Sequence, residues 1–292
     1  MTGGSGFAGR HLLERLDEPV APSRDELDLL DPEATSAAVR EAAPDVVFHL
    51  AALASVGRSW DAPAQTLSAN LTITANLLEA IRTEAPEARL VLISSGEIYG
   101  PPEYLPVDES AALRPQNPYA VSKAACDLLA GQYTDAYGAH VVRLRPFNHA
   151  GPGQSDDFVI GTLTRQVAEA EASGVSECVL RTGNVDSARD FTDVRDTVRA
   201  YVDAAELEPG VWNVASGRST TVRELIELVR AAARIPVRHE IDPAKVRLGD
   251  VPEVRGSAMR LRAATGWAPE ISLEQTVADA LNAWREHLSS VR

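Results

Sequence analysis

Cysteine and lysine are both rare in this chain. Its 292 residues include two cysteines, Cys126 and Cys178, whose separation fits neither a metal-binding pair nor a disulfide framework. Lysine also occurs only twice, at Lys123 and Lys245, although the chain carries 28 basic residues. Because arginine supplies the positive charge everywhere else, each lysine is a candidate for a role that arginine does not fill. The scarcity of cysteine favours a reducing, cytoplasmic location and gives no indication of a bound metal.

Long apolar runs and an excess of positive charge are also lacking. No stretch approaches the ~20 apolar residues of a membrane-spanning helix, and we expect no signal peptide because the N-terminus lacks its basic and apolar segments. Lys and Arg total 28 against 42 Asp and Glu, a formal net charge of −14. Such an acidic surface argues against a nucleic acid or an anionic membrane as partner. It still permits a local basic pocket for an anionic small molecule.

Short β-branched segments alternate with longer helical patterns along the chain. Strands are predicted at 46–51, 90–94, 141–145, 177–181, 211–215 and 237–241, and helices at 8–16, 32–42, 63–82, 118–137, 158–170, 194–205, 222–233 and 273–287. This alternation predicts an α/β fold with a Rossmann-like, doubly wound parallel sheet. Because the pattern loosens after about residue 150, we expect a smaller, interleaved C-terminal substrate lobe. The predicted domains are residues 1–150 plus about 190–216, and about 151–189 plus 217–292.

Three glycines open the chain at a spacing of three. Gly3, Gly6 and Gly9 lead directly into a helical pattern. Such a loop lets the backbone approach a pyrophosphate, and the following helix N-terminus offers N–H donors to it; a helix-entry turn without a ligand is the alternative. A buried strand of about five residues normally precedes the loop, but here only Met1 and Thr2 do. We therefore expect a truncated first strand and a start that is internal to a longer reading frame.

A second candidate cofactor contact follows about twenty residues after the glycines. Asp28 and Leu29 lie where an acidic residue of a dinucleotide fold contacts the adenosine half. Arg24 lies near the position that would sense a 2′-phosphate, which favours NADP over NAD. A solvated loop charge is the alternative for Arg24 and for Asp28.

The segment with the strongest chemical pattern begins at Pro118. It starts a predicted helix on which Tyr119 and Lys123 share one face. A nearby ammonium stabilises a phenolate, so we expect the pKa of Tyr119 to lie below the ordinary value of about 10. Ser94 and Ser95 follow a predicted strand, at the end where open α/β sheets bind ligands. A serine hydroxyl there could polarise a carbonyl while Tyr119 gives or takes the proton; a solvated helix pair and a loop cap are the alternatives.

These motifs, in this order, resemble the extended short-chain dehydrogenase/reductase family of nucleotide-sugar enzymes. The resemblance rests on the loop Gly3–Gly9, on His49-Leu-Ala-Ala52, on Ser94-Ser-Gly-Glu-Ile-Tyr-Gly100 and on Tyr119-x-x-x-Lys123. It implies a nicotinamide cofactor, NADP or NAD, and a catalytic triad of Ser95, Tyr119 and Lys123. The cofactor contacts that it implies are Gly3, Gly6, Phe7, Ala8, Gly9, Arg24, Asp28, Leu29, Leu50, Ala51, Ala52, Asn70, Tyr119 and Lys123. It also implies a homodimer formed through the two long helices at 63–82 and 118–137.

The later segments most resemble GDP-4-keto-6-deoxymannose reductases and the related GDP-mannose 4,6-dehydratases. The implied partner is therefore a GDP-sugar or another nucleotide-sugar. The substrate contacts implied by the resemblance are Asn148 at the sugar nucleotide, Asn184 and Arg189 flanking the nucleotide, Arg247 at the diphosphate and Asp250 at the ribose. Arginine suits a diphosphate because its guanidinium can bind two oxygens at once. Surface ion pairs for Arg189 and Arg247, and a helix cap for Asn148, are the alternatives.

Glu97 leaves the reaction open. It lies two residues after Ser95, where the dehydratases carry an acid/base glutamate, and a dehydratase needs this extra carboxylate to remove a C5 proton. A reductase needs only hydride delivery to a C4 ketone, protonation by Tyr119 and polarisation by Ser95. Gly96 and the run 145–154 favour the reductase. We expect reduction of the C4 ketone of GDP-4-keto-6-deoxy-D-mannose, with a 4,6-dehydratase, a 4-epimerase and a non-catalytic NAD(P)-binding protein as alternatives.

Overall fold

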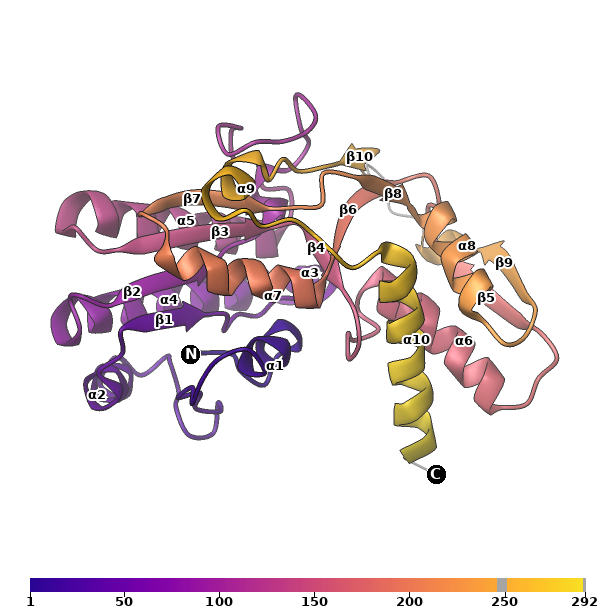
Figure 1. Ribbon diagram of the computed structural model, residues 1–292, viewed down its shortest axis with the longest axis horizontal. Coiled ribbons are helices and arrows are strands. Elements are labelled where there is room, and N and C mark those ends of the chain that lie inside the picture. Colours follow the sequence, from indigo (N-terminus) through magenta and orange to yellow (C-terminus); the bar gives the residue numbers. More distant parts are fainter. Residues whose placement is uncertain (246–250, 291–292) are drawn as a thin grey trace.

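A parallel sheet lies at the centre of the larger lobe (Figure 1). The computed structural model describes residues 1–245 and 251–290. The four strands of the sheet, in spatial order, are β1 (Val46–His49), β2 (Arg89–Ile93), β3 (Val141–Pro146) and β7 (Gly210–Val214). Their apolar runs are buried on both sides, as expected where helices cover a parallel sheet. The predicted Rossmann-like α/β fold is confirmed.

Helices cover both faces of this sheet. Helices α2 (Pro32–Ala42), α4 (Pro63–Glu84) and α5 (Pro118–Tyr137) pack together on one face, and α1 (Phe7–Leu13) packs with α7 (Val194–Asp203) on the other. Alternation along β2 assigns the faces, since Leu90 and Leu92 join the core under α4 and α5 while Val91 and Ile93 join the core under α1 and α7. Each long helix begins with proline at its first turn, as the sequence predicted.

The smaller lobe has its own hydrophobic core. Helices α6 (Val159–Ala172), α8 (Val222–Ala232) and α10 (Leu273–Ser290) enclose it with the parallel pair β5 (Cys178–Thr182) and β9 (Val237–Ile241). Between the lobes, β6 (Ala188–Asp193) pairs with β4 (Asn148–Ala150), β10 (Glu253–Val254) and the antiparallel β8 (Ser219–Thr221). The remaining short elements are α3 (Val56–Asp61), α9 (Met259–Thr265), η1 (Gly96–Tyr99), η2 (Ala204–Glu206) and η3 (Pro243–Lys245).

The C-terminal part of the chain is divided between the two cores. Leu261 of α9 and the following Trp267 are buried in the core of the larger lobe, whereas Val277 and Leu281 of α10 are buried in the smaller one. The expected substrate lobe therefore contains a stretch that packs with the sheet. The domain boundaries given above stay a prediction.

The sequence did not predict the strands between the lobes. In β6, Arg189 and Asp190 interrupt the apolar pattern that marks a strand. Asp190 is nevertheless buried, because its carboxylate accepts hydrogen bonds from the Ser216 backbone N–H (2.8 Å), the Ser216 hydroxyl (2.6 Å) and the Gly217 backbone N–H (3.0 Å). Only the folded chain brings these donors to the strand. The first helix also differs from its predicted range, 8–16, because it ends at Leu13.

Thr2 extends the sheet by one residue beyond β1. It pairs in parallel with His49, and its backbone N–H donates to the Phe48 carbonyl at 2.9 Å while the Leu50 N–H donates to its own carbonyl at 3.2 Å. The segment before the glycine loop is thus held in the sheet by backbone hydrogen bonds.

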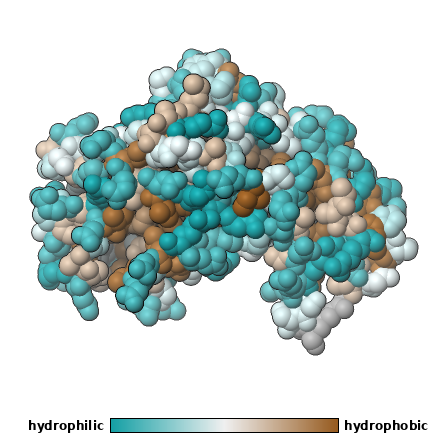
Figure 2. All heavy atoms as spheres, viewed as in Figure 1, coloured by the Kyte–Doolittle hydropathy of each residue, from teal (hydrophilic) through white to brown (hydrophobic). Residues whose placement is uncertain are grey.

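The outer surface is mostly hydrophilic, and a notch separates the two lobes. Figure 2 shows polar side chains over most of the visible face, with apolar side chains on both lobes. The carboxyl ends of the central strands point toward the smaller lobe (Figure 1). Within residues 1–245 and 251–290, no helix is both long enough and apolar enough to cross a membrane.

A buried polar network fixes α5 against the sheet. The Arg145 guanidinium donates to the Asp127 carboxylate at 2.8 and 3.0 Å and to the Tyr99 hydroxyl at 3.0 Å. The Tyr99 hydroxyl donates in turn to Asn213 at 2.7 Å, and the Asn213 amide donates to the Val107 carbonyl at 3.1 Å. The network joins α5, β3, η1 and β7, so it holds the helix that carries Tyr119 and Lys123.

Removing the Asp127 carboxylate should destabilise the fold strongly. Asp127→Ala leaves the buried Arg145 charge without its partner, which costs about 3–5 kcal/mol of unfolding free energy. The measurement is the shift of the urea unfolding midpoint. Arg40→Ala is the control, because it breaks an exposed ion pair with Glu84 and should move the midpoint little. Equal shifts for the two variants would contradict this interpretation.

Candidate active site

The glycine loop is packed too closely for any other residue at two of its positions. Gly3 has a φ of +76°, and a Cβ there would lie 2.7 Å from the Ala51 backbone nitrogen. A Cβ on Gly9 would lie 2.1 Å from the Gly3 carbonyl oxygen. Gly6 precedes α1 and provides no side-chain acceptor for its first turn. The loop is therefore a backbone surface that ends at a helix N-terminus, the arrangement that binds phosphate groups in dinucleotide folds.

The helix after this loop contacts the smaller lobe. The ring of Phe7 stacks on His149 with centroids 5.9 Å apart and an interplanar angle of 3°. The Arg10 guanidinium donates to the Gly153 carbonyl at 3.2 Å, and His11 Nε2 lies 2.9 Å from the Pro152 carbonyl oxygen. The glycine loop is thus held against the segment that follows β4.

The segment around residue 28 passes beside α4. The Asn76 amide of α4 donates to the Leu29 carbonyl at 2.9 Å. Asp28 is exposed and its carboxylate accepts the Leu30 N–H at 3.0 Å, while Arg24 is exposed in a turn. The contacts therefore fix the position of Leu29, and the roles of Arg24 and Asp28 at the adenosine half stay predictions.

The segment that follows β1 lies directly beside the glycine loop. Leu50 bonds to the Thr2 backbone, and Gly3 packs on Ala51, with Ala52 next in the chain. Asn70 of α4 holds the end of this segment, because its side chain accepts the Leu53 N–H at 2.7 Å and donates to the Leu53 carbonyl at 3.2 Å. The fold therefore brings Leu50, Ala51 and Asn70 to the edge of the sheet where the sequence predicted a cofactor.

The predicted triad gathers at the carboxyl end of β2. Ser95 caps η1, and its hydroxyl accepts the Glu97 N–H at 3.2 Å. Tyr119 lies in the first turn of α5, and the nearby Ser95 hydroxyl acts to lower the pKa of its phenol. Lys123, one turn along α5, is buried and its ammonium donates to the Ile93 carbonyl. The three side chains come from two elements that converge on one end of one strand.

The expected lowering of the Tyr119 pKa is wrong for this structure. Burial is the largest influence and raises the pKa of Tyr119 to about 12, against the opposing effect of the Ser95 hydroxyl. The Lys123 ammonium is directed at the Ile93 carbonyl, and its own pKa is lowered, mainly by burial. Loss of hydration therefore outweighs the attraction that the i, i+4 spacing suggested.

Glu97 lies close enough to the phenol to influence it. Its negative charge contributes to the raised pKa of Tyr119. One carboxylate oxygen accepts a hydrogen bond from the Asn117 amide at 3.3 Å, and the Asn117 side-chain oxygen caps α5 by accepting the Ala120 N–H at 2.8 Å. The carboxylate is thus held at the N-terminus of α5, next to Tyr119.

Two of the residues expected at the substrate lie on the strands between the lobes. Asn148 belongs to β4 and is half-buried, so it is not the helix cap that was the alternative. Arg189 of β6 donates to the Ala188 carbonyl at 2.9 Å and to the Val251 carbonyl at 2.8 Å. Asn184 is exposed, and its side chain accepts the Asp186 N–H at 3.0 Å. The two remaining predicted contacts, Arg247 and Asp250, lie outside the described residues.

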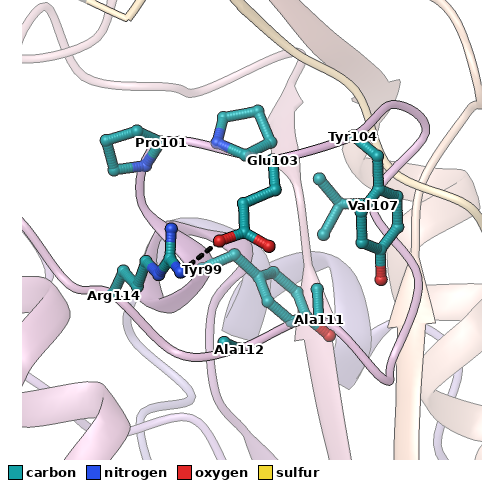
Figure 3. Close-up of a pocket in the computed structure, with 9 residues that line it drawn as sticks. Tyr99, Pro101, Glu103, Tyr104, Val107, Ala111, Ala112 and Arg114 are labelled. Atoms are coloured by element: carbon teal, nitrogen blue, oxygen red, sulfur yellow. Dashed lines mark hydrogen bonds and ion pairs between the residues drawn. The ribbon is translucent and has the colours of Figure 1, made fainter.

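A small pocket lies between Tyr99 of η1 and the following loop, residues 101–114 (Figure 3). Its lining includes Tyr99, Tyr104 and Val107, and an ion pair between Glu103 and Arg114 crosses it. Its volume of about 20 Å³ accommodates one water molecule at most. This pocket is therefore too small for a nucleotide-sugar, and the notch between the lobes is the better candidate.

The residues at the sheet edge fit a nicotinamide dinucleotide. The glycine loop has no side chains at Gly3, Gly6 and Gly9 to obstruct a pyrophosphate. At the carboxyl end of β2, the buried Ser94 hydroxyl has no hydrogen-bond partner among the described residues. No group of metal-binding side chains occurs in the described part of the chain.

Sequence reasoning missed several polar residues around this site. His49, Thr74 and Cys126 lie buried between β1, α4 and α5, and Ser122 accepts a hydrogen bond from the Asn70 amide at 2.9 Å. The one available signal was a histidine at the end of an otherwise apolar strand run, within the quoted His49-Leu-Ala-Ala52 motif. Nothing in the sequence indicates which side chains of α4 and α5 it meets.

Known proteins are similar to this chain in sequence and in fold over almost its whole length. The GDP-6-deoxy-D-mannose reductase of Pseudomonas aeruginosa is 40% identical over 297 residues, which cover 99% of this chain and 97% of that protein. The structure of RMD from Pseudomonas aeruginosa complexed with NADPH matches with a TM-score of 0.90 and 37% identity, over 98% of this chain and 97% of that one. UDP-glucose 4-epimerase from Thermus thermophilus, in complex with NAD, matches with a TM-score of 0.84 and 31% identity, over 97% of each chain.

A match to a protein-family model assigns the chain to a family. The model described as GDP-mannose 4,6 dehydratase matches residues 24–280. That range includes Ser95, Glu97, Tyr119 and Lys123, and it extends through both lobes. The chain therefore belongs to the GDP-mannose 4,6 dehydratase family, among the extended short-chain dehydrogenase/reductase enzymes.

Proposed function

We propose that this protein reduces the C4 ketone of a GDP-4-keto-6-deoxyhexose, GDP-4-keto-6-deoxy-D-mannose being the best candidate. The observation that carries the proposal is the group formed by Ser95, Tyr119 and Lys123 at the carboxyl end of β2, in a chain 40% identical to a reductase of this substrate class. Asn148 and Arg189, on the strands between the lobes, are proposed to contact the nucleotide. Arg247 and Asp250 keep their predicted roles at the diphosphate and ribose.

The protonation state of Tyr119 suits the reductive direction. With a pKa raised to about 12, the phenol carries a proton at neutral pH and can give it to a ketone oxygen as that oxygen gains negative charge. Ser95 donates to the same oxygen and polarises the carbonyl. Lys123, held by the Ile93 carbonyl, places a positive charge beside the site. NADPH or NADH, when bound, supplies the hydride to C4.

The cofactor is proposed to be NADP(H). The phosphates would lie on Gly3, Gly6 and Gly9 and the first turn of α1, which includes Phe7 and Ala8. Arg24 would donate hydrogen bonds to a 2′-phosphate, and the similar reductase structure was determined with NADPH. NAD is the alternative, supported by the similar epimerase bound to NAD.

Dehydration of GDP-mannose is the second candidate. Glu97 lies beside Tyr119, and a carboxylate there can remove a C5 proton and assist loss of the C6 hydroxyl. The family model itself carries the dehydratase description. Reduction needs only the triad, so the role of Glu97 decides between the two reactions.

We further propose a homodimer in the cytoplasm. Leu67 of α4 and Val121 and Leu128 of α5 are 38%, 41% and 60% exposed, and the last two lie seven residues apart on one helix face. A second copy would cover this apolar surface. Both cysteines, Cys126 and Cys178, are free and buried, which suits a reducing compartment.

The direct test of the reaction offers both substrates separately. Purified protein is incubated with GDP-4-keto-6-deoxy-D-mannose and NADPH, and in parallel with GDP-mannose and NADP⁺, and the products are identified by mass. The proposal expects a gain of two hydrogens in the first reaction and no loss of water in the second. If GDP-mannose loses water and the ketone is not reduced, the protein is a dehydratase. Cofactor binding without turnover of either would indicate a non-catalytic protein.

Replacing the phenol should abolish ketone reduction. Tyr119→Phe removes the proton donor and should lower kcat by about 100-fold or more, while the NADPH dissociation constant changes little because the ring stays. Stopped-flow oxidation of NADPH measures the rate. Tyr137→Phe, at the exposed end of α5, is the matched control. A Tyr119→Phe rate near that of the control would remove Tyr119 from the mechanism.

Neutralising Glu97 separates the two chemistries. For a reductase, Glu97→Gln should keep kcat within about threefold, because ketone reduction does not use the carboxylate. For a dehydratase, the same change should abolish water loss while ketone reduction by NADPH persists. Mass analysis of both reactions distinguishes these outcomes. Complete loss of ketone reduction in Glu97→Gln would contradict the claim that the triad suffices for this reaction.

A charge on the exposed face of α5 should prevent dimerisation. Leu128→Arg places a guanidinium in the proposed interface, where burying it without a partner is unfavourable. Light scattering after gel filtration should then give the mass of one chain, with the wild type at twice that mass. Met259→Arg, on the exposed surface of α9, is the control and should stay dimeric. A monomeric wild type would refute the dimer.

A further inference from the structure

His49, the last residue of β1, is a buried histidine that none of the roles above uses. Its side chain is 2% exposed, and both ring nitrogens have partners. Nδ1 lies 2.7 Å from the Thr2 hydroxyl, which immediately precedes the glycine loop. Nε2 lies 3.2 Å from the hydroxyl of Thr74, on α4 one turn after Asn70. One imidazole therefore joins the start of the cofactor loop to the helix that carries Asn70.

The ring is neutral throughout the physiological range. Burial is the main cause that lowers the pKa of His49 to about 3, and the positive charge of Lys123 acts in the same direction. A neutral imidazole has one N–H donor and one acceptor nitrogen. The two threonines therefore meet chemically different ends of the ring.

The neighbouring contacts determine which nitrogen carries the proton. The Ala51 N–H donates to the Thr2 hydroxyl oxygen at 3.4 Å, which leaves the Thr2 hydroxyl proton to donate to Nδ1. The Thr74 hydroxyl has two acceptors besides the imidazole, the Asn70 carbonyl at 2.9 Å and the Cys126 Sγ at 3.3 Å, so its oxygen is free to accept from Nε2–H. If Nδ1 carried the proton instead, it would donate to the Thr2 hydroxyl oxygen. The Thr2 hydroxyl proton would then have no acceptor among the described residues. The hydrogen bonds therefore run in one direction, from Ala51 to Asn70.

Both ends of this chain of hydrogen bonds hold the segment beside the glycine loop. At one end, Thr2 is bonded to the backbone of Leu50, and Gly3 packs against Ala51. At the other end, the Asn70 side chain accepts a hydrogen bond from the Leu53 backbone N–H and donates one to the Leu53 carbonyl. Residues 50–53 are thus fixed at two points, and His49 connects those points through the interior.

We propose that His49 is a positioning residue that, as the neutral Nε2–H tautomer, fixes the glycine loop relative to residues 50–53 and Asn70. It thereby sets where a nicotinamide dinucleotide lies relative to Tyr119. His49 touches no reacting atom and acts through Thr2 and Thr74. This inference rests on the proposed use of a nicotinamide cofactor.

Three substitutions separate the two ends of the ring. His49→Phe keeps the ring and removes both hydrogen bonds, His49→Asn keeps an acceptor near the position of Nδ1, and His49→Gln keeps a donor near the position of Nε2. We expect His49→Phe to raise the NADPH dissociation constant about tenfold, measured by nicotinamide fluorescence. His49→Asn should restore it to within about threefold of wild type, because the amide oxygen accepts from Thr2. His49→Gln should restore less.

The control is a histidine at the opposite end of the sheet. His140 is half-buried and its Nε2 lies 2.9 Å from the Leu207 carbonyl oxygen. His140→Phe should lower the melting temperature without changing the NADPH dissociation constant or kcat. If His49→Phe behaves in the same way, His49 is only structural and the proposal fails. If His49→Phe does not fold, equal NADPH affinities for His49→Asn and His49→Gln overturn the proposal instead.

The tautomer is tested without any turnover. Nitrogen-15 NMR of the ring should show a protonated Nε2 and an unprotonated Nδ1, with no titration between about pH 5 and pH 9. A protonated Nδ1, or a ring that titrates in this range, would overturn the assignment. Wild-type protein with the expected tautomer that fails to bind NADPH or NADH would instead contradict the proposed function.

Discussion

Parallel pairing of β1, β2 and β3 is the constraint on which the site depends. Because all three strands run the same way, the chain leaves each of them at the same edge of the sheet. Residues 50–53, the serines after β2 and the strand β4 after β3 therefore meet although they are far apart in sequence. The glycine loop reaches this edge through the pairing of Thr2 with His49. Ser95 and Gly3 lie at one edge of the sheet because each follows a segment that runs parallel to β1.

Burial shifts the pKa values of the ionisable groups at this edge of the sheet. It raises the pKa of the Tyr119 phenol and lowers the pKa of the Lys123 ammonium, so both groups are shifted toward their neutral forms. The same burial keeps His49 neutral and able to donate from one nitrogen and accept at the other. Burial therefore disfavours a Tyr119 phenolate stabilised by the Lys123 ammonium. It favours a protonated Tyr119 phenol that serves as an acid.

The polar groups that support the site lie mostly in the interior. Asp127 and Arg145 fix α5 to β3, and Asn70 fixes the backbone of Leu53. Asp127, Arg145 and Asn70 are themselves buried, and each has a hydrogen-bond partner, because an unpaired polar group would be costly there. The two lobes meet through α1, whose Arg10 and His11 contact the segment after β4. The geometry of the site is therefore determined by groups that would not themselves contact a substrate.

The sequence by itself determined the features that depend on local pattern. Strand and helix alternation predicted the parallel sheet, the glycine spacing predicted the loop, and the Tyr119-x-x-x-Lys123 spacing predicted a shared helix face. The tertiary structure alone decided what depends on neighbours distant in the chain. The direction of the Tyr119 pKa shift, the charged strand β6 and the two partners of His49 follow from burial and from hydrogen bonds between remote elements. A local pattern cannot report them, because hydration and hydrogen bonding are set by the surroundings of a side chain in space.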